Sequence, residues 1–403
     1  MTTETVPSKR NGGIADLKKM FGGGTSSLRQ FGILFSLIAI IVVFQIWTNG
    51  TTLSPQNLIN VVSQQSYILI LAIGMVMVII AGHIDLSVGS VAGFIGGLAA
   101  VLMVELQWHY IPAAIVCLLV GAMIGGLQGY FVAFHKIPAF IVTLGGMLVF
   151  RGLVLWLLGG KSIGPFPKEF QLLSSGFIPD PFGGESLRLL SLLIGCAVAF
   201  FIFYMNWRER ANHIKYGVAA EPVGFVIGKN VFFGGAIVYF SYLLASYKGI
   251  PNVVVVMFVL MLFFDFFTTR TTFGRRIYAL GGNEKAARLS GIKTNFLTFY
   301  TFVTMGVMAA LGGLVFAARL NTATPKAGDG MELDVIAACF IGGASTTGGF
   351  GKVVGAVIGA FVMGVMNNGM SILGIGIDWQ KVIKGVVLVA AVFVDLYQRN
   401  KAR

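Results

Sequence analysis

Long runs of apolar residues, separated by short polar segments, follow one another along almost the whole chain. A helix needs about 20 residues to cross the hydrocarbon core of a bilayer, and most of these runs approach or reach that length. The pattern predicts about twelve apolar helical segments. They lie near residues 30–48, 65–82, 86–104, 111–134, 138–159, 188–206, 230–247, 251–268, 296–319, 333–344, 353–373 and 379–396.

The segment at 333–344 is too short for a full crossing. We expect it to be re-entrant or buried within the protein, where non-helical backbone is tolerated at membrane depth. The prediction is therefore about ten to twelve full spans.

Composition places the chain among integral membrane proteins. Hydrophobic residues make up 56% and charged residues only 11%, with a mean hydropathy of +0.84. The 54 glycines fit close-packed transmembrane helices, whereas the strands of a membrane barrel would show short alternating segments. The predicted fold class is an all-α, polytopic helical bundle.

The net charge of +13 does not point to nucleic acid, because the basic residues lie mainly in short loops between apolar segments. Such loops are retained in the cytoplasm, so we expect both termini to be cytoplasmic. The predicted organisation comprises a cytoplasmic tail at 1–29, a transmembrane domain at 30–398 with an extracytoplasmic loop at 160–187 and a cytoplasmic loop at 269–294, and a cytoplasmic tail at 399–403.

No constellation of catalytic or metal-binding residues is evident. The string Gly159-Gly-Lys-Ser162 lacks the glycine that a phosphate-binding loop needs at position 155, where the chain has Leu155. The four histidines are scattered, and the three cysteines lie within apolar runs without metal-ligand spacing. We therefore predict no enzyme activity, no catalytic residue, no metal site and no cofactor bound by this chain.

Repeated glycines occur in both halves of the chain. Gly121, Gly125 and Gly129 recur at every fourth residue, as do Gly351, Gly355 and Gly359, and a Phe-Ile-Gly-Gly string occurs in each half, at 94–97 and at 340–343. An internal duplication is one explanation of this pattern. Close helix packing is the favoured explanation of these glycines.

A few polar residues lie at membrane depth, where they are costly unless paired or facing a wet cavity. Asp85 lies in a polar break between two apolar runs, and we favour a role in capping the helix that starts at Leu86 or Ser87 over substrate contact. A neutral sugar would need amides and hydroxyls more than charges. The candidates for a translocation path are therefore Asp85, Ser87, Asn367 and Asn368.

Four charged residues lie in or beside apolar runs, and pairing among them would remove the cost of isolated charges. They are Arg151, Asp334, Lys381 and Lys384. An ion-driven secondary transporter remains an alternative, in which Asp85, Asp334, Lys381 and Lys384 would serve as relay groups.

The basic segment at 269–294 differs from the other loops because small and apolar residues are interspersed among its cations. Gly281-Gly282 breaks the chain, Asn283 can cap a helix from Glu284 to Ser290, and Gly291 can end it in a left-handed turn. A short helix whose small residues enter a groove on a partner is predicted. The alternative is a solvated loop that only sets topology.

The residues of this basic segment and of three other stretches resemble those of a known family. Ala279-Leu-Gly-Gly-Asn-Glu-Lys-Ala-Ala-Arg-Leu-Ser-Gly-Ile292 resembles the coupling-helix loop of permease subunits in ABC-type monosaccharide importers of the ribose, xylose and arabinose class. Three further stretches agree: Ile84-Asp-Leu-Ser-Val-Gly-Ser90, Pro138-Ala-Phe-Ile-Val-Thr-Leu-Gly-Gly-Met147 followed by Arg151-Gly152, and Ala337-Ala-Cys-Phe-Ile-Gly-Gly343 followed by Gly348-Gly349. The additional pair of spans near 188–247 makes the chain most similar to xylose or multiple-sugar permeases.

The resemblance implies a multi-pass protein of the bacterial inner membrane that works as two permease copies. Its partners would be a cytoplasmic ATPase that binds ATP and Mg²⁺ and an extracytoplasmic sugar-binding protein, with no nucleic acid. The residues expected to contact the ATPase are Gly282, Asn283, Glu284, Ala286, Ala287, Arg288, Ser290 and Gly291. Related permeases carry nucleosides, a signalling furanose or branched-chain amino acids, which remain alternative substrates.

Overall fold

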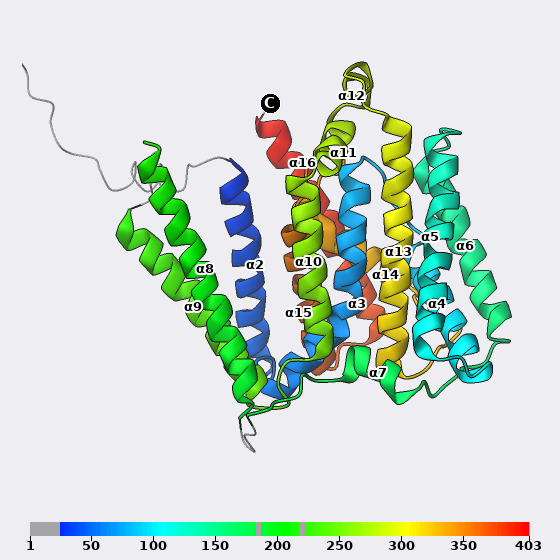
Figure 1. Cartoon of the computed structure of the whole chain (residues 1–403), viewed down its shortest axis with the longest axis horizontal. Coiled ribbons are helices and arrows are strands. Elements are labelled where there is room, and N and C mark those ends of the chain that lie inside the picture. Colours follow the sequence, from blue (N-terminus) through cyan, green and yellow to red (C-terminus); the bar gives the residue numbers. More distant parts are fainter. Residues whose placement is uncertain (1–24, 183–186, 218–221, 403) are drawn as a thin grey trace, which may run out of the picture.

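The computed structural model describes residues 25–182, 187–217 and 222–402, and the described chain is a bundle of helices (Figure 1). Most of the predicted tail at 1–29 therefore lies outside the described residues. Nine helical segments in the described part are long and apolar enough to cross a membrane. They are α3 (Pro55–Ile80), α4 with the π-helix η1 (Val88–Ala100 and Val101–Glu105), α5 (Tyr110–Ala133), α6 (Ala139–Leu157), α8 (Leu189–Lys215), α9 (Val223–Ala245), α10 (Asn252–Arg270), α13 (Thr294–Leu320) and α15 (Val353–Ile372).

The remaining helices are shorter or more polar, so the expected count of about twelve apolar segments includes three that do not meet these criteria. The described apolar part of α2 is only Leu34–Trp47. At 1.5 Å per residue α14 is about 16 Å long, half of the bilayer core, as expected for the segment near 333–344. Near its start α16 carries Asp378, Lys381 and Lys384. The bounds are α2 Thr25–Trp47, α7 Lys168–Ser175, α11 Thr272–Gly282, α12 Glu284–Leu289, α14 Met331–Ile341 and α16 Ile377–Ala402.

Four helices form the centre of the bundle. In the most apolar stretch of α3 the share of residues buried within the chain is 89%, and it is 72% in α4, α13 and α15, whereas in α6, α8 and α9 it is 11%. A helix that is apolar on all sides is stable in the interior of a large protein or against lipid. The outer helices therefore present apolar faces suited to a lipid environment, and the chain is a multi-pass membrane protein.

The repeated glycines pack helices against one another, as predicted. A Cβ at Gly125 would collide with the Phe302 carbonyl oxygen of α13, and one at Gly129 would lie 2.9 Å from the Phe299 carbonyl oxygen. A Cβ at Gly359 would likewise collide with the Ala338 carbonyl oxygen of α14. These positions exclude any side chain because the backbones of two helices touch there.

Two interruptions break the helical backbone, and the second packs against the helix that follows the first. Residues 81–87 separate α3 from α4, and residues 321–330 separate α13 from α14. Gly328, with φ of +81°, lies against the backbone of Gly89 in the first turn of α4, where neither residue has room for a Cβ. The two Phe-Ile-Gly-Gly strings lie in α4 and at the end of α14, each on a helix that follows such an interruption.

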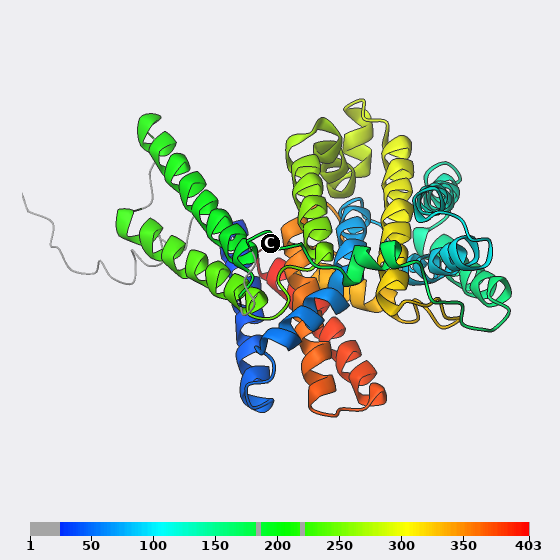
Figure 2. The same cartoon turned by 60° about the horizontal axis from the view of Figure 1, so that its bottom comes forward.

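The helices α8 and α9 form a hairpin that packs against the start of α3 through Leu244 and Ile59 and diverges from the bundle toward the other end (Figures 1 and 2). The Asn206 amide donates to Asn230 Oδ1 at 2.6 Å and joins the two helices. The two spans expected near 188–247 are therefore present as a helical pair.

Two ends of the bundle can be distinguished (Figure 1). The α12 end contains α11, α12 and the loop at 342–352. The α7 end contains the segment at 158–188, expected as a loop, in which α7 forms a short helix.

Candidate functional site

The basic segment at the α12 end folds as two helices. Thr271 caps α11 by accepting a hydrogen bond from the Gly274 N–H at 3.1 Å. Asn283 caps α12 by accepting one from the Ala286 N–H at 3.0 Å, and Gly291 follows with a left-handed φ of +80°. The predicted short helix and its cap are confirmed, whereas the chain break expected at Gly281-Gly282 is the last turn of a helix that was not predicted.

The exposed surface of α12 is small, basic and partly apolar. Ala286 and Arg288 are exposed, and Leu289 has 89% of its surface exposed. Ala287 is only 5% exposed, so it packs within this chain rather than facing a partner. Leu289 was missing from the predicted contact residues, although its place between Arg288 and Ser290 marks it as an apolar residue in a polar loop.

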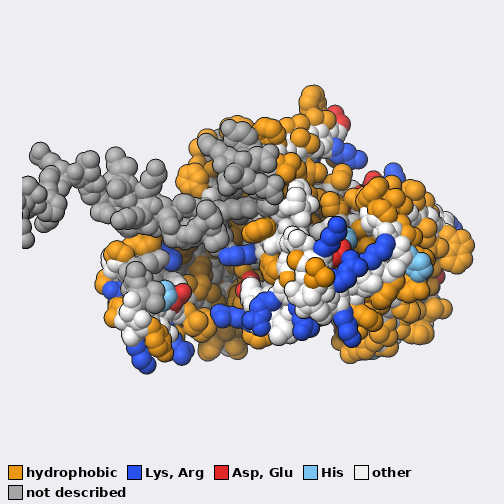
Figure 3. Space-filling view, turned by 90° about the horizontal axis from the view of Figure 1, so that it is seen from above, with side chains coloured by type: hydrophobic (Ala, Val, Ile, Leu, Met, Phe, Trp, Pro, Cys, Tyr) orange, Lys and Arg blue, Asp and Glu red, His pale blue; other side chains and the backbone are white. Residues whose placement is uncertain are grey.

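Cations gather around α11 and α12 (Figure 3). The exposed lysines and arginines on these helices and on the segments beside them are Lys136, Arg270, Arg275, Arg276, Lys285, Arg288, Lys293 and Lys352. This surface favours a partner with acidic residues facing it.

A surface ion pair ties α12 to the α5–α6 connection. Lys136 Nζ lies 3.3 Å from Glu284 Oε1 and donates to Asn295 Oδ1 at 2.7 Å. Both members of the Lys136–Glu284 pair are about half exposed, and such pairs contribute at most about 1 kcal/mol. The contact therefore orients α12 more than it stabilises the fold.

The end of α11 rests directly on backbone. A Cβ at Gly281 would collide with the Ile80 carbonyl oxygen and lie 2.6 Å from the Gly349 nitrogen. The Gly349 N–H donates to that same Ile80 carbonyl oxygen at 2.8 Å. Since Ile80 ends α3 and Gly349 lies in the loop that leads to α15, α11 touches the end of one membrane helix and the loop before another at one point, which we call the glycine seat.

A tyrosine supports the glycine seat. The Tyr278 hydroxyl of α11 donates to the Gly351 carbonyl oxygen at 2.7 Å. Burial, reinforced by the Asp265 carboxylate, raises the pKa of Tyr278, so the hydroxyl remains a donor at neutral pH.

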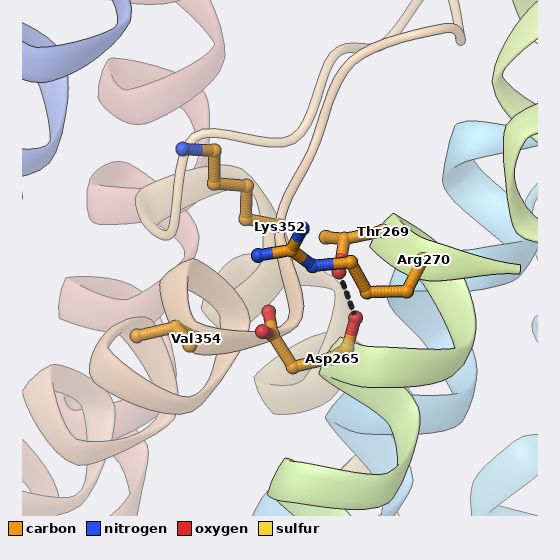
Figure 4. Close-up of a pocket in the computed structure, with 5 residues that line it drawn as sticks. All are labelled: Asp265, Thr269, Arg270, Lys352 and Val354. Carbon is orange, nitrogen blue, oxygen red and sulfur yellow. Dashed lines mark hydrogen bonds between the residues drawn. The ribbon is translucent and has the colours of Figure 1, made fainter. Parts of the chain in front are cut away.

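A cavity of about 430 Å³ opens beside this region, between α10 and the start of α15. Figure 4 shows the side chains of Lys352 and Arg270 reaching over it from these two elements, with Asp265 below, and the Thr269 hydroxyl donating to the Asp265 carbonyl oxygen at 2.6 Å. Two cations and one carboxylate leave a net positive charge, so the cavity extends the basic surface of the α12 end.

The polar break at 81–87 forms a buried hydrogen-bonded cluster. Asp85 Oδ1 accepts from the Ser87 N–H at 2.8 Å and from the Ser87 hydroxyl at 2.6 Å. The Gln128 amide of α5 donates to Ser87 Oγ at 2.9 Å. The N–H that Asp85 accepts belongs to Ser87, the residue before α4 begins at Val88. Asp85 therefore orders the break before α4 and does not cap a helix that starts at Leu86 or Ser87, as was expected. Gln128 was missed, and its signal is a single amide in an apolar run.

The two candidate asparagines of α15 contact different helices. Asn368 exchanges two amide hydrogen bonds with Asn57 of α3, at 2.9 and 3.0 Å. The Asn367 amide lies 3.5 Å from Asp334 Oδ2, and Asn367 Oδ1 is buried without a hydrogen-bond partner in the described chain. Among the hydrogen bonds of the described residues, only those between Asp85 and Ser87 join two of the four candidate path residues.

The charged residues in the apolar segments are paired in part. Lys384 Nζ lies 2.9 Å from Asp334 Oδ2, and Arg151 lies 2.8 Å from Asp329, a residue that was not among the expected partners. Lys381 is exposed. Among the described residues no group of three or more His, Cys, Asp or Glu side chains is placed to hold a metal ion.

Removal of the Asn283 cap should loosen α12. We expect Asn283→Ala to cost about 1 kcal/mol and to accelerate backbone amide hydrogen exchange in residues 284–290 of the purified protein roughly fivefold. Asn283→Asp keeps the acceptor oxygen and should exchange like the unmodified protein. Equal exchange in the Ala and Asp variants would show that Asn283 does not cap α12.

Comparison with known proteins relates almost the whole chain to transport permeases. The family described as the permease component of the branched-chain amino acid transport system matches residues 57–392. The xylose transport system permease protein XylH of Escherichia coli (strain K12) is 38% identical over 97% of this chain and 96% of its own length. XylH of Haemophilus influenzae is 38% identical over 95% of this chain and its full length.

A ribose permease is more distant over a similar length. The ribose import permease protein RbsC of Escherichia coli (strain K12) is 33% identical over 98% of this chain and 99% of its own length. No solved structure matches the chain.

Proposed function

The chain belongs to the family described as the permease component of the branched-chain amino acid transport system, and from this premise we propose that it is the permease subunit of an ABC importer for a monosaccharide. The two kinds of relative described above carry the names of xylose and ribose permeases, which favours a pentose or related hexose over an amino acid. The protein is a transport subunit, and hydrolysis of ATP with Mg²⁺ belongs to a separate ATPase.

The observation that carries the proposal is the position of α12. This helix protrudes from the α12 end with Leu289 exposed, and it follows α11, which rests on the glycine seat. A partner that pushes on α12 would act through a rigid contact on the end of α3 and on the loop that leads to α15. Coupling between two sites needs a physical connection of this kind.

We place the ATPase at the α12 end, in the cytoplasm, and an extracytoplasmic sugar-binding protein at the α7 end. Both termini would then be cytoplasmic, the segments α2 and α16 would complete about ten to twelve spans, and the complex would contain two copies of this chain in the bacterial inner membrane. The basic loops at the α12 end support this orientation.

The proposed mechanism is alternating access. ATP binding closes the ATPase pair and moves α12, and the motion passes through the glycine seat to the helices that flank the break at 81–87. Two alternative packings of these helices would open the path to one side or the other.

The proposed translocation path includes Asp85, Ser87, Asn367 and Asn368. Asp85, Ser87 and Asn368 have hydrogen-bond partners within the chain. Asn367 Oδ1 is buried and free to accept a hydrogen bond. A sugar hydroxyl would satisfy it, so Asn367 is the strongest of the four.

The test replaces the exposed apolar surface of α12. We expect the double variant Ala286→Glu, Leu289→Glu to lower ATP-driven sugar uptake by about tenfold or more, since a central contact residue contributes on the order of 2 kcal/mol. Ala287 is left unchanged because it is buried within the chain. Uptake is measured in vesicles that contain the permease, its ATPase and its binding protein.

The matched control is the double variant Ile214→Glu, Tyr216→Glu, which places the same two charges on exposed residues at the end of α8 and just after it. It should leave uptake unchanged. Normal uptake by the α12 variant at equal membrane levels would exclude α12 as the coupling element. Uptake that persists without the ATPase and disappears with the ion gradient would favour a secondary transporter instead.

A further inference from the structure

A second cavity is lined by residues of α3, α7 and α13 and of the segment after α7. Figure 1 shows α7 at the end of the bundle opposite α12. The volume of the cavity is about 300 Å³, at the small end of the range for ligand pockets, which is about 300–1,000 Å³. Three helices and the segment after α7 form its walls. The lining residues are Ile59, Asn60, Ser63, Ser174, Ser175, Phe177, Arg319 and Leu320.

The lining of this cavity is rich in uncharged hydrogen-bonding groups. Asn60 supplies an amide, and three serines supply hydroxyls that can both donate and accept. Ser174 is 1% exposed, and its hydroxyl has no hydrogen-bond partner in the described chain. Because buried polar groups are nearly always satisfied, this hydroxyl points to a ligand that is absent from the structure.

The charge of the lining narrows the class of ligand. Arg319 is the single charged residue among the eight that line the cavity, and no carboxylate accompanies it. An amino acid would bring an ammonium group that these residues cannot neutralise. A neutral polyol can use every polar group present, and Phe177 and Ile59 offer apolar surface to the C–H face of a sugar ring.

Helix α7 covers the cavity, and hydrogen bonds on both sides of this helix hold it in place. Before α7, the Phe166 N–H donates to Asn321 Oδ1, just after α13, at 2.8 Å. After α7, the Asn252 N–H at the start of α10 donates to the Gly176 carbonyl oxygen at 2.9 Å, and the Asn252 amide donates to the Leu172 carbonyl oxygen at 2.9 Å. The helix α7 therefore spans the ends of α13 and α10 and holds Ser174 and Ser175 over the polar part of α3.

We propose that this cavity is a binding site for one neutral monosaccharide, in which Asn60, Ser63, Ser174 and Arg319 hydrogen-bond the sugar hydroxyls. The proposal rests on the function proposed above and adds an entry site at the end where the sugar would arrive. Such a site would hold the sugar beside α3 and α13 before the helices re-pack.

The experiment uses a cysteine as a reporter. Cys117 and Cys339 are buried and Cys196 is exposed. In a Cys196→Ala protein, therefore, no exposed native thiol competes for a membrane-impermeant thiol reagent. Ser175→Cys is introduced into this protein and labelled by the reagent. D-xylose at ten times its dissociation constant should slow labelling of the introduced thiol by about tenfold, by mass action. L-leucine at the same concentration should have no effect.

Two variants test which groups bind. Asn60→Leu and Ser63→Ala, each added to the reporter, should weaken protection by xylose, whereas Gln56→Leu, an exposed residue on the same helix outside the cavity, should not. Binding of radiolabelled xylose to each purified permease gives the same comparison without the cysteine.

Absence of both protection and xylose binding would overturn the site, and so would protection that is equal in the Asn60, Ser63 and Gln56 variants. Stronger protection by leucine would also overturn it. ATP-driven xylose uptake by the unmodified complex separates the two proposals, because it persists if only the cavity assignment fails and is absent if the importer assignment fails.

Discussion

Gly281→Ala is expected to abolish most transport, because the added methyl group has no room at the glycine seat. Its Cβ would collide with the Ile80 carbonyl oxygen and lie 2.6 Å from the Gly349 nitrogen, and both obstacles are backbone, which cannot rotate away. Overpacking of this kind costs about 1–3 kcal/mol, which corresponds to roughly a 5- to 150-fold change in a coupled equilibrium. The measurement is ATP-driven sugar uptake in vesicles at equal permease content.

A glycine on another helix provides the control. A Cβ at Gly228 of α9 would meet no atom within 4 Å, so Gly228→Ala should slightly stabilise α9 and leave uptake unchanged. ATPase binding by Gly281→Ala should persist, since α12 is untouched. Normal uptake by Gly281→Ala would show that α11 does not transmit motion through this contact.

Removal of Lys384 is expected to destabilise the protein strongly. Lys384 Nζ lies 2.9 Å from Asp334 Oδ2, and the two side chains are 26% and 14% exposed. Loss of one partner costs at most about 1 kcal/mol in a surface pair and about 3–5 kcal/mol in a fully buried one, where the other charge is left uncompensated, so this half-buried pair should fall between the two. We expect Lys384→Leu to lower the thermal unfolding midpoint of the purified permease markedly.

Two further variants test whether the loss of stability comes from the broken Asp334–Lys384 ion pair or from any change of a lysine on α16. Replacing both residues, in Asp334→Leu with Lys384→Leu, removes the unpaired charge and should recover most of the lost stability. Lys381→Leu changes an exposed lysine one turn earlier on α16 and should have little effect. If the double variant unfolds as early as Lys384→Leu, pairing with Asp334 is not what Lys384 contributes.

If the double variant folds stably, it also tests whether the Asp334–Lys384 pair takes part in transport. If it remains folded but carries no sugar, the Asp334–Lys384 pair takes part in transport rather than only in packing. Asn367 lies beside this pair, with its amide 3.5 Å from Asp334 Oδ2, so an effect there would support the proposed path at α15.

Local signals predicted the parts of the candidate site that depend on neighbours in the sequence. The helix α12 followed from Asn283 and Gly291, because capping and left-handed termination involve residues only a few positions apart. The position of α11 did not follow, since two glycines usually weaken a helix. In the folded chain a glycine is required at position 281 because the Ile80 carbonyl oxygen leaves no room for a Cβ.

The start of α3 is another feature that local sequence signals did not predict. Its apolar run suggested a beginning near residue 65, but the helix begins at Pro55. The polar residues Asn57, Asn60 and Ser63 interrupt the apolar pattern, and only the structure shows that Asn57 pairs with Asn368 while Asn60 and Ser63 line a cavity.

The sequence by itself determined the class of protein, most of its membrane helices and the short capped helix, because span length, composition and helix ends are set by residues close together in the chain. The tertiary structure decided which backbone supports Gly281, which carboxylate pairs with Lys384 and which polar groups share a cavity. These contacts join residues far apart in the sequence, and helix packing, rather than any local pattern, brings them together.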